Sequence, residues 1–148
     1  MSLKTRVQDD MKAAMRARET ARLSAIRLLL AAIKQREVDE RIELDDTGVL
    51  AVVDKLVKQR RDAAEQYDKA GRDELAAAER FEIDVLATYL PAALGEQELV
   101  AAIQAAITDT GARGAADMGK VMGVLKSQLA GRADMTEVSR RVRAQLAG

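Results

Sequence analysis

Apolar residues recur at intervals of three and four along nearly the whole chain, and this periodicity constrains the fold more than any other feature. In the first segment the pattern reads Leu3, Val7, Met11 and Ala14. Such spacing places the apolar side chains on one face of an α-helix. Proline, which interrupts helices, occurs only at position 91, and the aromatic residues that favour strands make up 2% of the chain. The pattern therefore predicts an all-α protein.

Local start and stop signals divide the periodic pattern into seven expected helices. The first four are expected at residues 3–17, at 20–43, from the caps at 45–47 to Gly71, and at 73–89, and Thr20 is expected to cap the second. The last three are expected at 96–109, at 118–130, and after a capping box at 134–137, and Asp117 is expected to cap the helix at 118–130. Pro91 pushes the preceding residue toward extended geometry, so a boundary is expected at 90–95. We predict an N-terminal four-helix domain at 1–90 and a C-terminal three-helix bundle at 91–148.

The side-chain inventory excludes several classes of site. The chain contains no His and no Cys, which excludes Ser-His-Asp or Cys-His catalysis and an ordinary zinc site. No glycine-rich phosphate-binding motif is present. The acidic run at 37–46 lacks the spacing of a calcium loop, and we interpret it as a solvated helix end. The sequence therefore predicts no catalytic residue, no metal and no cofactor.

Charge and hydropathy bear on location. The 24 basic and 24 acidic residues cancel, so no overall field draws the protein to a membrane or to nucleic acid. No apolar run has membrane-spanning length, and we find no signal peptide. The basic start resembles a transit peptide in part, but Asp9 and Asp10 argue against one. We expect a cytoplasmic protein that does not bind membranes.

Two glycines interrupt the helix predicted at 118–130. Gly119 and Gly123 are four residues apart on one helix face, and each costs about 1 kcal/mol relative to Ala in a helix interior. They let either a neighbouring helix pack closely or a sugar–phosphate backbone approach, with cations neutralising its charge. The cations near this face are Lys126, Arg132, Arg140 and Arg143. Spacing alone favours helix packing.

Three stretches of the sequence resemble the YqeY-like (GatB/YqeY) family. They read LLLAAIKQREVDER at 28–41, KQRRDAAEQYDKAGRDELAAAERFEIDVLATYLPAAL at 58–94 and DMGKVMGVLKSQLAGRADMTEVSRRV at 117–142. The most specific pieces are YLP at 89–91, the paired Met-Gly at 118–119 and 122–123, and GRAD at 131–134. The resemblance covers nearly the whole chain.

The resemblance implies an all-helical fold whose last three helices are similar to the tail domain of the GatB subunit of the tRNA-dependent amidotransferase, a domain that contacts tRNA. The contact residues carried over by position are Met118, Gly119, Lys120, Met122 and Gly123, with Arg132 nearby. The catalytic, ATP-using domain of that subunit precedes the tail, and this chain is too short to contain it. The resemblance therefore implies that a family label of glutamine-dependent carbon–nitrogen ligase would be inherited from the tail, which performs no chemistry.

We therefore expect a non-catalytic adaptor that binds tRNA or another structured RNA. Two alternatives stay open. One is an accessory of tRNA-dependent amidation, with amidotransferase subunits or a tRNA synthetase as partners. The other is a protein–protein scaffold in which the helices at 20–43 and 49–70 dimerise or hold a partner. The neutral net charge and the lack of aromatic residues that could stack on bases keep this alternative open.

Overall fold

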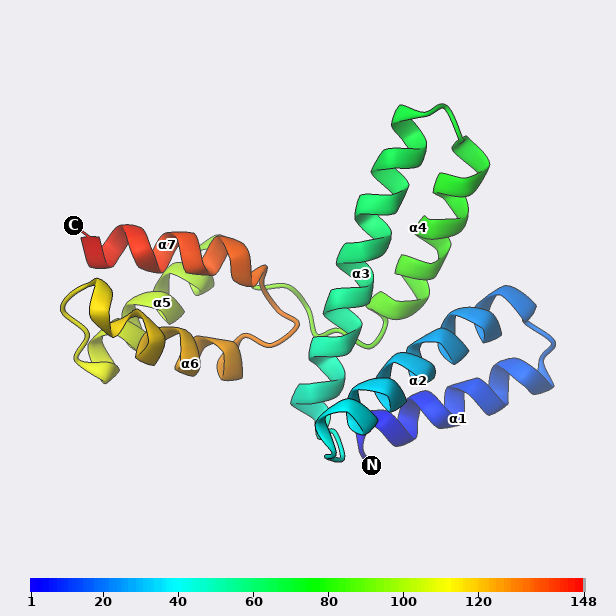
Figure 1. The fold of residues 1–148 in the computed structure, drawn as a ribbon, viewed down its shortest axis with the longest axis horizontal. Helices are drawn as coiled ribbons and strands as arrows, with labels where there is room; N and C mark the ends of the chain where they lie inside the picture. Colours follow the sequence, from blue (N-terminus) through cyan, green and yellow to red (C-terminus); the bar gives the residue numbers. More distant parts are fainter. Residues whose placement is uncertain (148) are drawn as a thin grey trace. The chain divides into compact units, whose positions relative to one another are not determined.

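The chain is all-α. A computed structural model describes residues 1–147, and over this range it contains seven α-helices, one short 3-10 helix and no strand (Figure 1). The helical periodicity read from the sequence is therefore confirmed as the fold class. Every expected helix is present, with ends that differ from the expected ones by a few residues.

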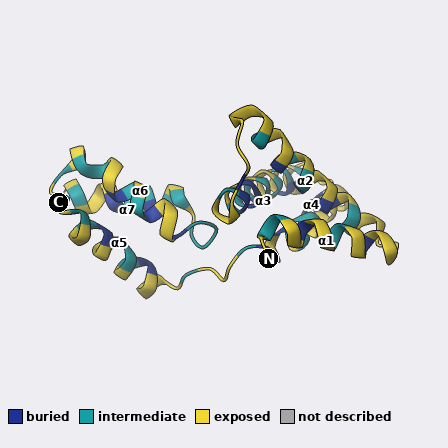
Figure 2. Cartoon of the chain, turned by 90° about the horizontal axis from the view of Figure 1, so that it is seen from below, coloured by how far each residue is buried: buried dark blue, intermediate teal, exposed yellow. Residues whose placement is uncertain are grey.

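The helices fall into two compact units that meet in sequence at Leu90 and Pro91. The helix before this point ends at Ala87 and the next one begins at Glu96, so Pro91 lies in the connecting segment. Figure 2 shows the buried residues gathered on the sides of the helices that face their neighbours within each unit. The prediction that 1–90 and 91–148 are domains stays a prediction, because independent folding is a separate property that expression of each part would test.

The first unit contains α1 (Leu3–Arg16), α2 (Thr20–Glu40), α3 (Asp46–Lys69) and α4 (Asp73–Ala87). In Figure 1, α1 lies beside α2, and α3 lies beside α4. The apolar faces of the four helices form one core. Its largest fully buried members are Val7, Ile26, Leu29, Ile33, Val49, Val53, Val57 and Leu86.

The ends of α2 and α3 follow from local hydrogen bonding. Arg41 takes a left-handed conformation with φ 53°, which ends α2 before the predicted position 43. The Asp45 carboxylate accepts a hydrogen bond from the backbone N–H of Gly48 at 2.8 Å, which confirms the predicted cap of α3. The prediction of Thr20 as a cap is wrong, because Glu19 is the N-cap residue of α2 and makes no side-chain cap hydrogen bond.

The acidic run is only partly solvated. Glu37 accepts hydrogen bonds from Lys4 Nζ at 2.9 and 3.0 Å and from the backbone N–H of Leu44 at 2.8 Å. These donors, Lys4 first, lower the pKa of Glu37. The interpretation of the whole run as a solvated helix end is therefore wrong at this residue, because Glu37 ties α1 and the α2–α3 loop to the end of α2.

Tyr89 of the YLP motif closes the first unit. The residue is 4% exposed, and its hydroxyl donates a hydrogen bond to the Asp10 carboxylate at 2.6 Å. The Arg6 guanidinium lies over the ring, 5.1 Å from its centroid. Burial and the bond to Asp10 raise the pKa of Tyr89, so this residue stays a neutral donor.

The second unit contains α5 (Glu96–Thr110), the 3-10 helix η1 (Ala115–Asp117), α6 (Met118–Gln128) and α7 (Met135–Ala147). No aromatic residue occurs after position 90, so the core is aliphatic. Its buried members are Leu99, Ile103, Ala106, Val121, Leu125, Leu129, Val138 and Val142.

The start of α6 differs from the predicted cap. The side chain of Asp117 makes no cap hydrogen bond and instead accepts one from the backbone N–H of Arg113 at 3.0 Å. This contact closes the loop before η1. At the other end Gly131 has the expected left-handed φ of 72°, although α6 already ends at Gln128.

Candidate nucleic-acid interface

The two glycines of α6 lie on an exposed face of the second unit. A Cβ atom added at Gly119 or at Gly123 would meet no heavy atom within 4 Å. Both residues are exposed, whereas Val121 and Leu125 are buried on the opposite side of the helix. Close packing of a neighbouring helix, the interpretation that spacing alone favoured, is therefore wrong within the second unit, because no other described helix of that unit covers the glycine face.

A groove runs beside this face, between α6 and α7. Its volume is about 620 Å³. It is lined by Met122, Lys126, Met135, Thr136, Glu137, Ser139, Arg140 and Arg143. Four of the predicted contact residues, one methionine and three cations, thus share one concavity. Lys126 lies beside the glycine face, because it follows Gly119 by seven residues and Gly123 by three, which are spacings of about two turns and one turn of helix.

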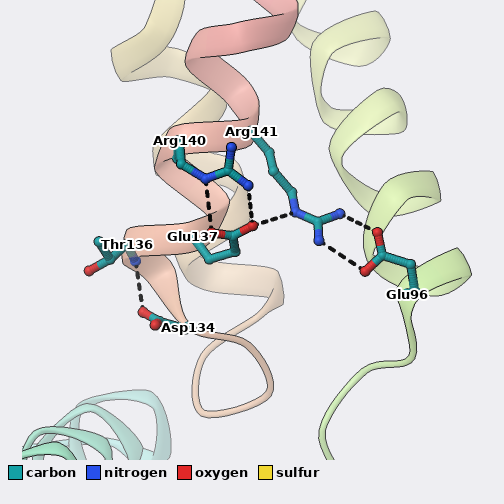
Figure 3. A network of polar contacts seen from close by, with 6 residues as sticks. All are labelled: Glu96, Asp134, Thr136, Glu137, Arg140 and Arg141. Atoms are coloured by element: carbon teal, nitrogen blue, oxygen red, sulfur yellow. Dashed lines mark hydrogen bonds and ion pairs between the residues drawn. The ribbon is translucent and has the colours of Figure 1, made fainter.

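The cations of the groove differ in their partners. Among the residues that the structure describes, none offers a carboxylate within 4.0 Å of Lys126 or Arg143. Arg140 donates to Glu137 through Nε at 3.0 Å and through a terminal nitrogen at 2.5 Å (Figure 3). The groove therefore combines two cations available for a ligand with a third that is already oriented.

Glu137 is held ionised by its neighbours. Hydrogen bonds from Arg140 and then Arg141 lower its pKa to about 2. The Arg141 Nε bond to Glu137 measures 3.1 Å. This carboxylate is the one acidic group lining the groove, and two guanidinium groups compensate its charge.

Arg141 also links α7 to the start of α5. Its two terminal nitrogens donate to both oxygens of Glu96, at 2.6 and 2.9 Å (Figure 3). This bidentate contact lowers the pKa of Glu96 and holds the guanidinium in one orientation. Sequence reasoning missed the network. The spacing of Glu137 and Arg141 signals an i,i+4 pair, but nothing local signals Glu96, which lies 45 residues away.

Arg132 has a structural contact that its place in the sequence did not reveal. Its Nε donates to the carbonyl of Ala92 at 3.3 Å, and its own carbonyl accepts from the N–H of Leu94 at 3.0 Å. A terminal nitrogen lies 4.0 Å from Glu98. The residue thus fastens the segment that leads into α5 to the α6–α7 turn, and it does not line the groove.

The remaining predicted contact residues lie at the start of α6. Met118 is partly buried and packs against the core, as does Met122. Lys120 is exposed, with its Nζ 4.0 Å from Asp117. Of these two methionines only Met122 lines the groove, while Met118 belongs to the core and Lys120 adds a solvent-facing charge on the helix that carries the glycines.

The donors of the groove suit an anionic ligand. Lys126, Arg140 and Arg143 are cationic, and Thr136 and Ser139 offer hydroxyl groups. Residues 1–147 contain no group of three acidic side chains placed to hold a metal ion. No helix in the same range is long and apolar enough to cross a membrane. The groove can bind phosphate oxygens by charge and hydrogen bonding.

The chain is similar to known proteins over nearly its whole length. The sequence model described as Yqey-like protein matches residues 4–146. The chain belongs to this family. A relative from Pyrenophora tritici-repentis, named altered inheritance of mitochondria protein 41, mitochondrial, is 30% identical over 143 residues, which are 93% of this chain and 77% of the relative.

Proteins of the same name occur in other fungi. The one from Eremothecium gossypii is 37% identical over 87 residues, 58% of this chain and 48% of its own length. The one from Kluyveromyces lactis is 34% identical over 107 residues, 70% of this chain and 57% of its own length. The chain spans about half the length of most of the curated relatives it matches.

The comparisons correct one prediction. The expectation of a cytoplasmic protein is contradicted by these relatives, which are named as mitochondrial proteins. The physical reason is that a neutral net charge and the absence of long apolar runs describe a folded helical domain, not its compartment. Targeting segments are recognised by receptors and removed, so the folded part carries no record of them.

Proposed function

We propose that the chain is a non-catalytic RNA-binding adaptor whose α6–α7 face contacts the sugar–phosphate backbone of a structured RNA. One observation carries the proposal. The groove beside the open glycine face is lined by three cations, Lys126, Arg140 and Arg143, and by one carboxylate, Glu137. The net charge of the lining is therefore +2, in a protein whose overall charge is zero. The resemblance of the tail to a tRNA-contacting domain makes tRNA the first RNA to test.

The physical basis of binding is counterion release. Each cation that neutralises a phosphate frees a condensed counterion, so affinity falls steeply with salt. Lys126 and Arg143 have no ion pair to break among the described residues, so they meet phosphate without losing an existing partner. Gly119 and Gly123 leave one face of α6 without side chains, so the sugar–phosphate backbone of an RNA can approach the helix closely there.

The decisive experiment measures binding of unfractionated tRNA by fluorescence anisotropy over a series of salt concentrations. We expect Lys126→Glu combined with Arg143→Glu to weaken binding at low salt. Removing two phosphate contacts should also reduce the slope of log K against log salt by about 2, one for each cation. Circular dichroism checks the fold, which both changes should leave intact because both residues are exposed.

A matched control changes the same net charge elsewhere. Lys12 and Lys69 are exposed cations of the first unit, and Lys12→Glu with Lys69→Glu alters the protein's charge equally. This control should keep the wild-type slope. The proposal fails if wild-type protein does not bind tRNA at low salt, or if both double variants weaken binding to the same degree.

A role as an accessory of tRNA-dependent amidation rests on the family resemblance alone and stays a prediction. Co-purification with amidotransferase subunits, or a change in their activity when this protein is added, would support it. RNA binding does not depend on that outcome, because the groove and its charges belong to this chain.

A further inference from the structure

Glu137 is an acidic residue in a groove to which we assign a phosphate backbone as ligand. The lining of that groove carries three cations and this one carboxylate. By charge alone Glu137 should oppose RNA binding, because a carboxylate and a phosphate repel each other. Its contacts with the neighbouring arginines indicate a different role, in which the carboxylate is needed for binding.

Glu137 holds Arg140 along one edge of the guanidinium. The Nε and one terminal nitrogen of Arg140 donate to the two oxygens of Glu137, at 3.0 and 2.5 Å (Figure 3). Two parallel hydrogen bonds of this kind fix the plane of a guanidinium relative to a carboxylate. A guanidinium has five N–H donors, so the edge formed by the two terminal nitrogens still offers a donor from each. Arg140 can therefore bind Glu137 and a phosphate group at the same time.

Arg141, the next residue, is engaged on all three of its nitrogens. Its Nε donates to Glu137 at 3.1 Å, and its terminal nitrogens donate to both oxygens of Glu96 at 2.6 and 2.9 Å. Its side chain is 25% exposed, whereas that of Arg140 is 66% exposed. The two arginines thus differ in what they can do. Arg141 fixes Glu137 from the side of α5, and Arg140 keeps donors for a ligand.

Building on the RNA contact proposed above, we propose that Glu137 is a positioning residue, which orients Arg140 so that its free edge binds a phosphate of the RNA. A long side chain that is ordered only on binding costs roughly two- to tenfold in affinity. Arg140 avoids much of this cost, because its guanidinium is held before the RNA arrives. The two arginines also compensate the charge of Glu137, which limits its repulsion of phosphate.

The test is Glu137→Gln in the full chain, with binding of unfractionated tRNA measured by fluorescence anisotropy at low salt. Glutamine has nearly the same shape, but its amide has one acceptor oxygen, so Arg140 loses one of its two hydrogen bonds. We expect binding to weaken about threefold, within the range for ordering one side chain. Charge alone predicts tighter binding, because the variant removes the carboxylate from the groove lining. The sign of the change therefore separates the two.

The same substitution in an Arg140→Met background distinguishes positioning from a general structural effect. With no guanidinium to orient, Glu137→Gln should no longer weaken tRNA binding. A carboxylate that only stabilises α7 would instead weaken binding equally in both backgrounds. Circular dichroism checks that the single and double variants fold.

Two further variants complete the design. Glu98→Gln is the matched control, because it removes the same charge from the same unit at a residue that is 68% exposed and outside the groove lining. It should not weaken binding. Arg140→Lys keeps the charge of the groove, but an ammonium group lacks the planar fork that meets a carboxylate and a phosphate together. It should weaken binding about threefold, and it decides the matter if Glu137→Gln does not fold.

The results separate this positioning role from the proposed RNA contact. Wild-type protein that does not bind tRNA at low salt would refute both. Where wild type binds, three results refute the positioning role alone. They are unchanged or tighter binding by Glu137→Gln, equal weakening with and without Arg140, and equal weakening by Glu137→Gln and Glu98→Gln.

Discussion

Replacing Gly123 with Ala should stabilise the second unit. Gly123 lies five residues from each end of α6, which runs from Met118 to Gln128. A methyl group there would meet no heavy atom within 4 Å, and the backbone is not in the left-handed region that disfavours Ala. The substitution therefore adds helix propensity and causes no clash.

The size of the effect follows from that geometry. Ala exceeds Gly by about 1 kcal/mol in a helix interior, and with no steric cost the full gain should appear in the free energy of unfolding. For a domain near this size, about 1 kcal/mol raises Tm by roughly 4–8 °C. Gly119→Ala should gain less, because Gly119 is the second residue of α6, where fewer helical hydrogen bonds depend on the position.

Amide hydrogen exchange is the suitable assay, since the second unit has no aromatic residue to report its unfolding. Protection of the α6 amides should rise about fivefold, the factor that corresponds to about 1 kcal/mol. Gly48→Ala is the contrasting control. Its Cβ would lie 2.8 Å from Leu44 Cδ2, so a rearrangement of that side chain should cancel the propensity gain.

A loss of protection in Gly123→Ala would refute this reasoning, because it would show that another segment packs on the glycine face. The same face can then be tested for RNA binding with Gly123→Leu. We expect this variant to fold as the wild type and to bind tRNA more weakly, since the larger side chain keeps a phosphate backbone away from α6.

Three further changes test other parts of the fold. Arg141→Met should lower Tm at pH 7. After Arg140, Arg141 is the second cause of the low pKa of Glu137, which is about 2 against an ordinary 4.5, and it also lowers the pKa of Glu96, so the difference from wild type should shrink as pH falls from about 4.5 to 2. Tyr89→Phe should cost about 2 kcal/mol in urea unfolding, because it removes the hydroxyl bonded to Asp10. Leu125→Ala should cost about 2–5 kcal/mol in thermal unfolding of the second unit, since Leu125 is fully buried.

Local rules accounted for most helix positions. The helix expected at 3–17 is Leu3–Arg16, and the helix expected at 118–130 is Met118–Gln128. Periodicity, caps and the single proline act over one or two turns, so they can be read from neighbouring residues. The errors lie at helix ends, where Arg41 and Asp117 take conformations or partners that residue type alone does not specify.

The candidate site was only partly accessible to sequence reasoning. Met122, Lys126, Arg140 and Arg143 were singled out and lie in one groove. Arg132, chosen by the same reasoning, holds a chain segment through backbone contacts instead. Charge and helical spacing identify which residues can face a ligand, but they do not tell which cations another part of the chain already occupies.

The sequence by itself determined that this chain is helical, where its helices lie, and that it lacks the side chains for His- or Cys-based chemistry. Tertiary structure alone decided that the glycine face of α6 is open within the second unit, that Arg141 joins Glu137 to Glu96, and that Glu37 joins Lys4 to the backbone of Leu44. The physical reason is range. Helix formation depends on residues within four positions of one another, whereas coverage of a face depends on segments far apart in the chain.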